Sequence, residues 1–427
     1  MTMTNLILPP RTGPRPLALH LACATMIWLT SSAALPVARR GLMHWKPELE
    51  KAARELAPAL ESAAPDALHA ALTGEVKKRV EIMLAGVEAY RAHPYRRALD
   101  EPPVLWAEGS SRLYDYGAAA PAGTSARPVL FVPSLVNRGY VLDLSARRSL
   151  LRHLAANGLR PLLLEWGAPG EAERDFSFTD YVTRRLEGAL DAALAATGGP
   201  LGLVGYCMGG QLALALALRR ADAIERIALL ATPWDYHANP PAQLQALAAV
   251  AGPLRMVIEA AGELPVDWIQ SLIAGLDPAL VPTKFRAFAA LDPTSPAAED
   301  FVALEDWVND GIALTGPVAR EFLFGWYVEN WPAQGRWLID DEPVDPARLA
   351  SPTLLILPEH DRIVPPAGAR ALADAIPGAL VHSVPFGHIG MVVSAKAQGA
   401  VWSLLADWFA PARPASARRA RNSPTQA

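Results

Sequence analysis

A cysteine at position 207 has the surroundings of a reactive nucleophile. It lies in the run Gly205-Tyr206-Cys207-Met208-Gly209-Gly210, between an apolar stretch at 201–204 and a helical pattern at 211–220. A nucleophile held in a sharp strand-to-helix turn needs glycine two positions before and two positions after it, because a Cβ there would collide with backbone. The N-terminus of the following helix also favours negative charge near the sulfur. The alternative is a small buried cysteine, but strand, glycines and helix together favour a nucleophile elbow.

A thiol that attacks an acyl group needs a base, and a carboxylate that orients the base. Asp361 follows an apolar run at 353–357, and His388 lies in the glycine-flanked loop after a second run at 380–384. The chain order of nucleophile, acid and base is the one found in α/β-hydrolase folds. The alternative, for Asp361 and for His388, is a loop residue without a catalytic role.

Two further groups of residues are expected near this triad. The backbone N–H of Met208 is the expected oxyanion donor, with a second N–H supplied from residues 134–136. His237 and His360 are candidates for contact with the triad, whereas the other histidines lie on predicted helices or strands or precede the sheet.

The elements that must position these residues alternate along the chain. Strands are predicted at 128–133, 161–166, 201–204, 226–231, 353–357 and 380–384, and helices at 145–156, 178–197 and 211–220. This alternation is typical of a mostly parallel central sheet with right-handed crossovers. The predicted fold class is α/β, an α/β-hydrolase fold with a helical cap insertion and a helical N-terminal region.

The same pattern predicts the domain organisation. The expected segments are a helical N-terminal region (1–100), the first part of the core (101–232), the helical cap (233–349), the second part of the core (350–410) and a disordered basic tail (411–427). A cap over the carboxyl ends of the strands would enclose the nucleophile and shape an apolar acyl pocket. Its candidate residues are Trp268, Trp307, Phe322, Phe324 and Trp326, each of which could instead belong to the cap's own core.

Composition excludes several classes of function. The net charge of -4 gives no electrostatic basis for binding nucleic acid. Two cysteines cannot form a disulfide framework, and neither zinc-ligand spacing nor a phosphate-binding glycine loop is present, so no metal or nucleotide cofactor is expected. The cytoplasm is the expected compartment. The apolar segment 16–38, interrupted by polar residues and Pro36 and followed by Arg39 and Arg40, favours a buried or surface-docking helix over export or membrane insertion.

Cysteine in place of serine suits a thioester substrate, since thiol exchange preserves the activation of the acyl group. The chain resembles the polyhydroxyalkanoate (poly-3-hydroxybutyrate) synthases, and is closer to the short catalytic subunit of the two-component enzymes than to the long single-component ones. The matching segments are 205–210, 133–138, 140–144, 149–150, 301–307 with Asp310, 360–366, 387–390, 393–394 and 396–397. Arg362 departs from the family, which usually has histidine there, and segment 16–38 is an extension.

The resemblance implies an acyltransferase that moves (R)-3-hydroxyacyl groups from CoA to a hydroxyl acceptor. Cys207 would be the nucleophile, His388 the base and Asp361 its orienting or hydroxyl-activating carboxylate, with the CoA thioester as substrate and no cofactor. It also implies a growing polyester or granule surface as partner, a homodimer, and a second synthase subunit. The location would be cytoplasmic, at storage granules or the inner membrane surface. The alternatives are a hydrolase on the same triad (a thioesterase or an intracellular polyester depolymerase) and a non-enzymatic granule- or membrane-surface binding protein.

Overall fold

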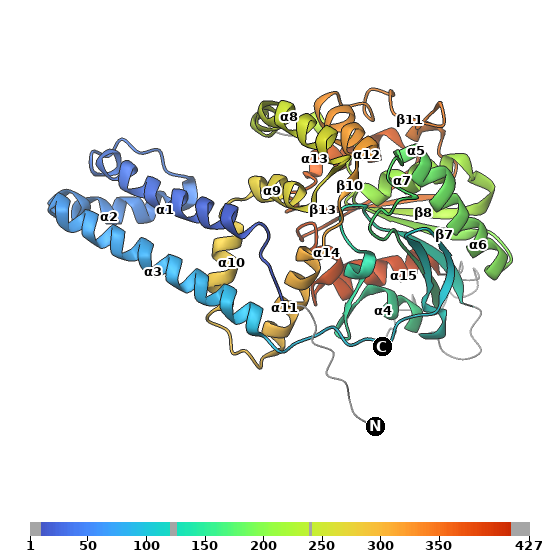
Figure 1. Ribbon diagram of the computed structural model, residues 1–427, viewed down its shortest axis with the longest axis horizontal. Coiled ribbons are helices and arrows are strands. Elements are labelled where there is room, and N and C mark those ends of the chain that lie inside the picture. Colours follow the sequence, from blue (N-terminus) through green and yellow to red (C-terminus); the bar gives the residue numbers. More distant parts are fainter. Residues whose placement is uncertain (1–9, 120–125, 239–240, 411–427) are drawn as a thin grey trace, which may run out of the picture. The chain divides into compact units, whose positions relative to one another are not determined.

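The computed structural model describes residues 10–119, 126–238 and 241–410 (Figure 1). The chain divides into two compact units: one comprises Met1–Ala98 with Pro265–Ala313, and the other Leu99–Leu264 with Leu314–Ala427. The predicted basic tail at 411–427 lies outside the described residues. The segment 233–349 was predicted to form a cap over the nucleophile, and both its bounds and this placement stay a prediction.

The larger unit is built on an eight-stranded sheet in the order β1-β2-β6-β3-β7-β8-β13-β14. The strands from β6 to β14 run parallel, whereas β2 pairs antiparallel with both β6 and β1. Their bounds are β1 (Val104–Glu108), β2 (Ser111–Asp115), β3 (Arg127–Val132), β6 (Leu159–Glu165), β7 (Leu201–Tyr206), β8 (Ile224–Leu230), β13 (Thr353–Pro358) and β14 (Leu380–Val384). Strands β7 and β13 are buried at every position, as expected for short apolar runs covered on both faces.

Helices connect and cover these strands (Figure 1). They are α4 (Leu150–Ala156), α5 (Phe178–Asp180), α6 (Glu187–Thr197), α7 (Met208–Arg219), α8 (Pro241–Ala261), α12 (Gly316–Arg320), α13 (Pro366–Ala375), α14 (Gly390–Val393) and α15 (Ser403–Phe409). Three π-helical segments, η4 (Tyr181–Leu186), η7 (Glu321–Val328) and η9 (Gln398–Trp402), continue or precede them. Helix α7 packs on β7 and is buried over nearly its whole length, so the turn between these two elements is held inside the unit.

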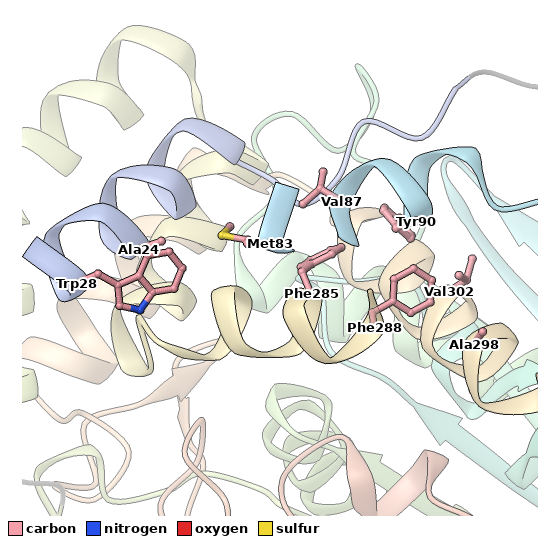
Figure 2. Packing of buried hydrophobic residues seen from close by; sticks show 9 residues of the cluster. All are labelled: Ala24, Trp28, Met83, Val87, Tyr90, Phe285, Phe288, Ala298 and Val302. Carbon is pink, nitrogen blue, oxygen red and sulfur yellow. The ribbon is translucent and has the colours of Figure 1, made fainter. Parts of the chain in front are cut away.

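The smaller unit consists of helices. They are α1 (Leu17–Arg39), α2 (Glu50–Ser62), α3 (Pro65–Ala92), α9 (Val266–Leu276), α10 (Leu280–Phe288) and α11 (Pro296–Asn309). Their common core contains Ala24 and Trp28 of α1, Met83, Val87 and Tyr90 of α3, Phe285 and Phe288 of α10, and Ala298 and Val302 of α11 (Figure 2). Gly86 lets α3 approach α10 closely, because a Cβ there would lie 2.0 Å from the backbone oxygen of Phe285.

Most predicted elements are present, with differences at particular ends. The helix predicted at 145–156 begins only at Leu150, because residues 143–149 form the short strands β4 (Asp143–Ser145) and β5 (Arg148–Ser149) and the Ser149 hydroxyl accepts a hydrogen bond from the Arg152 N–H (3.0 Å). Helix α7 begins at Met208 instead of residue 211, since the Gly210 N–H already donates to the Cys207 carbonyl (2.9 Å). Strands β1 and β2, and the short pairs β9 (Glu263–Leu264) with β10 (Leu314–Thr315) and β11 (Leu338–Ile339) with β12 (Glu342–Pro343), were not expected.

The apolar side chains of the helical N-terminal region are only partly buried. Met83 and Val87 of α3 lie in the core, whereas Leu49, just before α2, and Leu56, within it, are exposed. Segment 16–38 is helical, as α1, and buries one face. It is also long and apolar enough to cross a bilayer, by length and composition alone.

Candidate active site

Cys207 occupies the turn between β7 and α7 with a backbone conformation that few side chains adopt. Its φ and ψ are 57° and -131°, and its N–H donates to the carbonyl of Leu230 in the neighbouring strand β8 (2.9 Å). A positive φ in a non-glycine residue costs about 1–3 kcal/mol and persists where the surrounding structure enforces it, most often at functional sites. The observed turn therefore has the strained geometry expected of a nucleophile elbow.

The three glycines of the elbow are required by close packing. A Cβ at Gly205 would lie 2.4 Å from the Gly210 Cα, and a Cβ at Gly210 would lie 1.9 Å from the Thr232 hydroxyl oxygen. At Gly209 it would lie 2.2 Å from the carbonyl oxygen of Val132, at the end of β3. Any side chain would push α7 away from β3, β7 and β8, and so displace Cys207.

The structure brings His388 and Asp361 together after the strands that were predicted to position them. The loops after β13 and β14 place the Asp361 Oδ2 2.6 Å from the His388 Nδ1, and both side chains are buried. The other carboxylate oxygen of Asp361 accepts hydrogen bonds from the N–H groups of Ile363 and Val364, both at 2.8 Å. Asp361 is thus held by its own loop, and it leaves the second ring nitrogen of His388 available to another group.

The electrostatics of His388 connect it to Cys207. Burial alone would lower the pKa of His388, but the charge on Cys207 and hydrogen bonds to Asp361 and Cys207 raise that pKa to about 10. The imidazolium is therefore favoured at neutral pH while Cys207 carries negative charge. The thiol can therefore pass its proton to the imidazole of His388, while the carboxylate of Asp361 orients the ring and stabilises the imidazolium.

Three tyrosines surround this group, and none of them was predicted from the sequence. The Tyr206 ring stacks on His388 with centroids 5.2 Å apart, and its hydroxyl donates to the His388 carbonyl (3.1 Å). The Tyr236 hydroxyl donates to the Gln211 side-chain oxygen in α7 (2.8 Å). Burial, followed by the negative charges of Cys207 and Asp361, raises the pKa of Tyr327.

Tyr327 differs from the other two tyrosines because its hydroxyl has no hydrogen-bond partner among the described residues. It lies on the π-helical segment η7, with its ring 4.5 Å from that of Tyr236 and 5.2 Å from that of Phe322. π-Helical turns occur frequently at functional sites. No spacing rule relates residue 327 to residue 207, so only the tertiary structure could reveal that Tyr327 lies near the site. Tyr206, in contrast, directly precedes Cys207 in the chain, and this adjacency could have indicated its position in the site.

The remaining predicted residues lie elsewhere or have other partners. The ring of His237 is exposed and contacts the backbone carbonyls of Tyr327 and Val328, and the His360 N–H donates to the Phe386 carbonyl. Of the predicted pocket aromatics, Phe322, Phe324 and Trp326 belong to the same unit as Cys207, with Trp326 stacked on Phe178 at 4.3 Å, whereas Trp268 and Trp307 belong to the helical unit.

Within the part of the chain that the structure describes, no group of three or more histidine, cysteine, aspartate or glutamate side chains is arranged to hold a metal ion. Met208 is buried as the first residue of α7, where a backbone N–H has no acceptor within the helix. The second expected oxyanion donor, at 134–136, stays a prediction.

Comparison with known proteins gives the family. The family described as alpha/beta hydrolase fold matches residues 127–395. Three relatives are named poly(3-hydroxyalkanoate) polymerase subunit PhaC. The one from Haloferax mediterranei is 29% identical, over 72% of this chain and 63% of its own length; the one from Synechocystis sp. is 31% identical, over 66% and 77%; and the one from Allochromatium vinosum is 28% identical, over 69% and 84%.

Solved structures give a weaker likeness. An alpha/beta hydrolase fold protein from Nakamurella multipartita is 20% identical, with a TM-score of 0.42 over 73% of this chain and 99% of that one. The alignment with the Haloferax protein spans less than two thirds of that relative. The sequence relatives, together with the parallel sheet and the elbow, show that the chain belongs to the poly(3-hydroxyalkanoate) polymerase family, a family of enzymes within the α/β-hydrolase superfamily.

Proposed function

We propose that this chain is a polyhydroxyalkanoate synthase, which transfers (R)-3-hydroxyacyl groups from CoA to a hydroxyl acceptor through a thioester on Cys207. The observation that carries the proposal is the buried hydrogen bond between His388 and Asp361 beside a cysteine in a nucleophile elbow. The relatives named poly(3-hydroxyalkanoate) polymerase support the choice of substrate class.

The first half of the reaction loads the enzyme. The Cys207 thiol gives its proton to His388, and the sulfur attacks the thioester carbonyl carbon of the acyl-CoA. The carbon–sulfur bond to CoA then breaks, and the departing sulfur takes the proton from His388. The products are free CoA and an acyl group bound to Cys207. Asp361 keeps the Nδ1–H of His388 oriented and stabilises the imidazolium during both proton transfers.

The second half transfers the acyl group. The terminal hydroxyl of a growing polyester gives its proton to His388, and its oxygen attacks the acyl carbon on Cys207. An ester forms, the bond to Cys207 breaks, and His388 returns the proton to the sulfur. Water at the same position would give hydrolysis, so synthesis requires that water be excluded from the loaded enzyme.

Two groups are proposed to stabilise the oxyanion and orient the acyl chain. The N–H of Met208 points out of the first turn of α7 and supplies one donor. The Tyr327 hydroxyl supplies a hydrogen bond to an oxygen of the substrate, since it has no other partner in the described residues and its raised pKa keeps it protonated at neutral pH.

We also propose the partners and the cellular location that the resemblance implies. The acyl donor is a 3-hydroxyacyl-CoA, the acceptor is the growing polyester at a granule surface, and no cofactor takes part. The working form is proposed to be a homodimer. A second synthase subunit is proposed to join it, because three relatives are named as subunits of a polymerase. The cytoplasm is the proposed compartment, at storage granules or the inner membrane surface.

The test is acyl transfer by the purified chain from (R)-3-hydroxybutyryl-CoA. Free CoA is followed with a thiol reagent and the acyl products are identified by mass spectrometry. The matched pair of variants is Cys207→Ala and Cys23→Ala, since the chain has two cysteines and Cys23 lies on α1 in the helical unit.

We expect CoA release, oligomeric hydroxyacyl products and an acyl adduct on the Cys207 peptide. All three should be lost in Cys207→Ala and kept in Cys23→Ala. Release of free 3-hydroxy acid alone would replace the synthase by a hydrolase. CoA release that survives in Cys207→Ala would contradict the proposed nucleophile.

A further inference from the structure

Helix α1 exposes an apolar face that nothing in the described structure covers. Its buried side carries His20, Ala24 and Trp28. The opposite side exposes one row at helical spacing, in which Met26 is 66% and Leu29 55% accessible to solvent, and Val37 continues the row. Residues 17–38 include no Asp, Glu, Lys or Arg. A surface helix of a globular protein normally turns charged side chains toward water, so this face is exceptional.

The neighbouring helix α3 provides the contrast within the same unit. Its exposed side carries the (i, i+4) ion pairs Lys77–Glu81 and Arg79–Glu75, the ordinary pattern for a helix in water. Two hydroxyls on the exposed side of α1, by comparison, are turned back onto its own backbone. The Thr25 hydroxyl donates to the Leu21 carbonyl (2.8 Å), and the Thr30 hydroxyl donates to the Ile27 carbonyl (2.9 Å). Such bonds satisfy hydroxyl groups where water is absent.

The chain that follows α1 adds an aromatic and cationic end to this face. Leu42, which is 66% accessible, and Trp45 are exposed between Arg40 and Lys46. The side chains of Arg40 and Lys46 make no ion pair or hydrogen bond with any residue that the structure describes. Tryptophan flanked by lysine and arginine is typical of the interface between lipid hydrocarbon and headgroups.

We infer that α1, together with residues 40–46, is a membrane-surface anchor that lies in the plane of an anionic phospholipid bilayer. The buried side of α1 packs against α3 and α10, so the helix is held flat while it remains part of the unit. Met26, Leu29, Val37 and Leu42 enter the acyl region, and Arg40 and Lys46 contact the lipid phosphates.

The charges favour lipid over a second copy of the chain as the occupant of this face. Residues 17–46 contain three cationic side chains and no acidic one. Two copies that met through this segment would therefore bring like charges together without a counter-charge, whereas anionic headgroups supply one.

The test is flotation of the full chain with vesicles of phosphatidylcholine, alone or mixed with phosphatidylglycerol. We expect the chain to float with the mixed vesicles, and Met26→Glu/Leu29→Glu to weaken binding at least about tenfold, since two buried apolar side chains become charged. The matched control is Leu84→Glu/Leu280→Glu, which changes two exposed leucines of α3 and α10 and should bind as the original chain does. Replacing Arg40 and Lys46 by Gln should remove most of the preference for phosphatidylglycerol, roughly tenfold.

Further measurements test whether the double variant is folded and how deeply Trp45 enters the bilayer. Circular dichroism and acyl transfer should be unchanged in Met26→Glu/Leu29→Glu, and quenching by brominated lipids should fall in Trp45→Phe. The inference is overturned if the original chain does not float, or if the double variant binds equally well. It is also overturned if light scattering shows that the double variant merely dissociates a dimer, if the chain binds polyester particles but no vesicles, or if the mass of the purified protein shows that α1 has been removed.

Discussion

The charge coupling between Cys207 and His388 gives the sharpest test of the site. The pKa of His388 is raised from 6.5 to about 10, which corresponds to about 5 kcal/mol in favour of the imidazolium. Burial lowers this pKa, and Cys207 is the largest of the influences that raise it. In Cys207→Ala, burial still lowers the pKa of His388, whereas the largest influence that raises this pKa is lost. We therefore expect the pKa of His388 to fall by at least about 1, which is on the order of 1 kcal/mol.

The measurement is NMR of histidine ring carbons, selectively labelled, as a function of pH. The His388 signal is assigned by its loss in His388→Gln, and Cys23→Ala serves as the control that removes a thiol far along the chain. Because the folded-state pKa is raised, the contribution of His388 to stability is fully present below about pH 6.5 and is lost as the pH rises through about 10. A His388 that titrates near 6.5 in the original chain, or that titrates identically in Cys207→Ala, would refute the coupling.

Three further substitutions test the surroundings of the site. Asp361→Asn should lower turnover about 10³- to 10⁴-fold, because His388 loses the carboxylate 2.6 Å from its Nδ1, and steady-state assays with unchanged circular dichroism would show it. Tyr327→Phe should lower acyl transfer up to about tenfold with little change in melting temperature, as expected for one lost hydrogen bond to substrate; equal kinetics in both proteins would exclude that bond. Gly209→Ala should destabilise or prevent folding because its Cβ would lie 2.2 Å from a carbonyl oxygen, whereas Gly74→Ala in α3, with open space around its Cβ, should melt at or above the original temperature.

The local chemistry of the elbow could be predicted because it depends on neighbours in the chain. Strand β7, the glycines and helix α7 are contiguous with Cys207, so their spacing alone indicates a strand-turn-helix corner. Strand β14 was likewise predicted at the residues where it is found, 380–384. Strands β1 and β2 were missed, since β1 lies at the edge of the sheet and β2 mixes apolar with charged residues. Antiparallel pairing of β1 with β2, and of β2 with β6, holds both in place.

The sequence by itself determined the order of strands, elbow, acid and base, because each is specified by short-range patterns and by family resemblance. Only the tertiary structure decided which distant groups meet at the sulfur. The packing of η7 places Tyr327 where burial and then the charge of Cys207 raise its pKa. The division of segment 233–349 between two units follows from the packing of α10 and α11 against α3. Such contacts depend on long-range burial of apolar side chains, which no local spacing encodes.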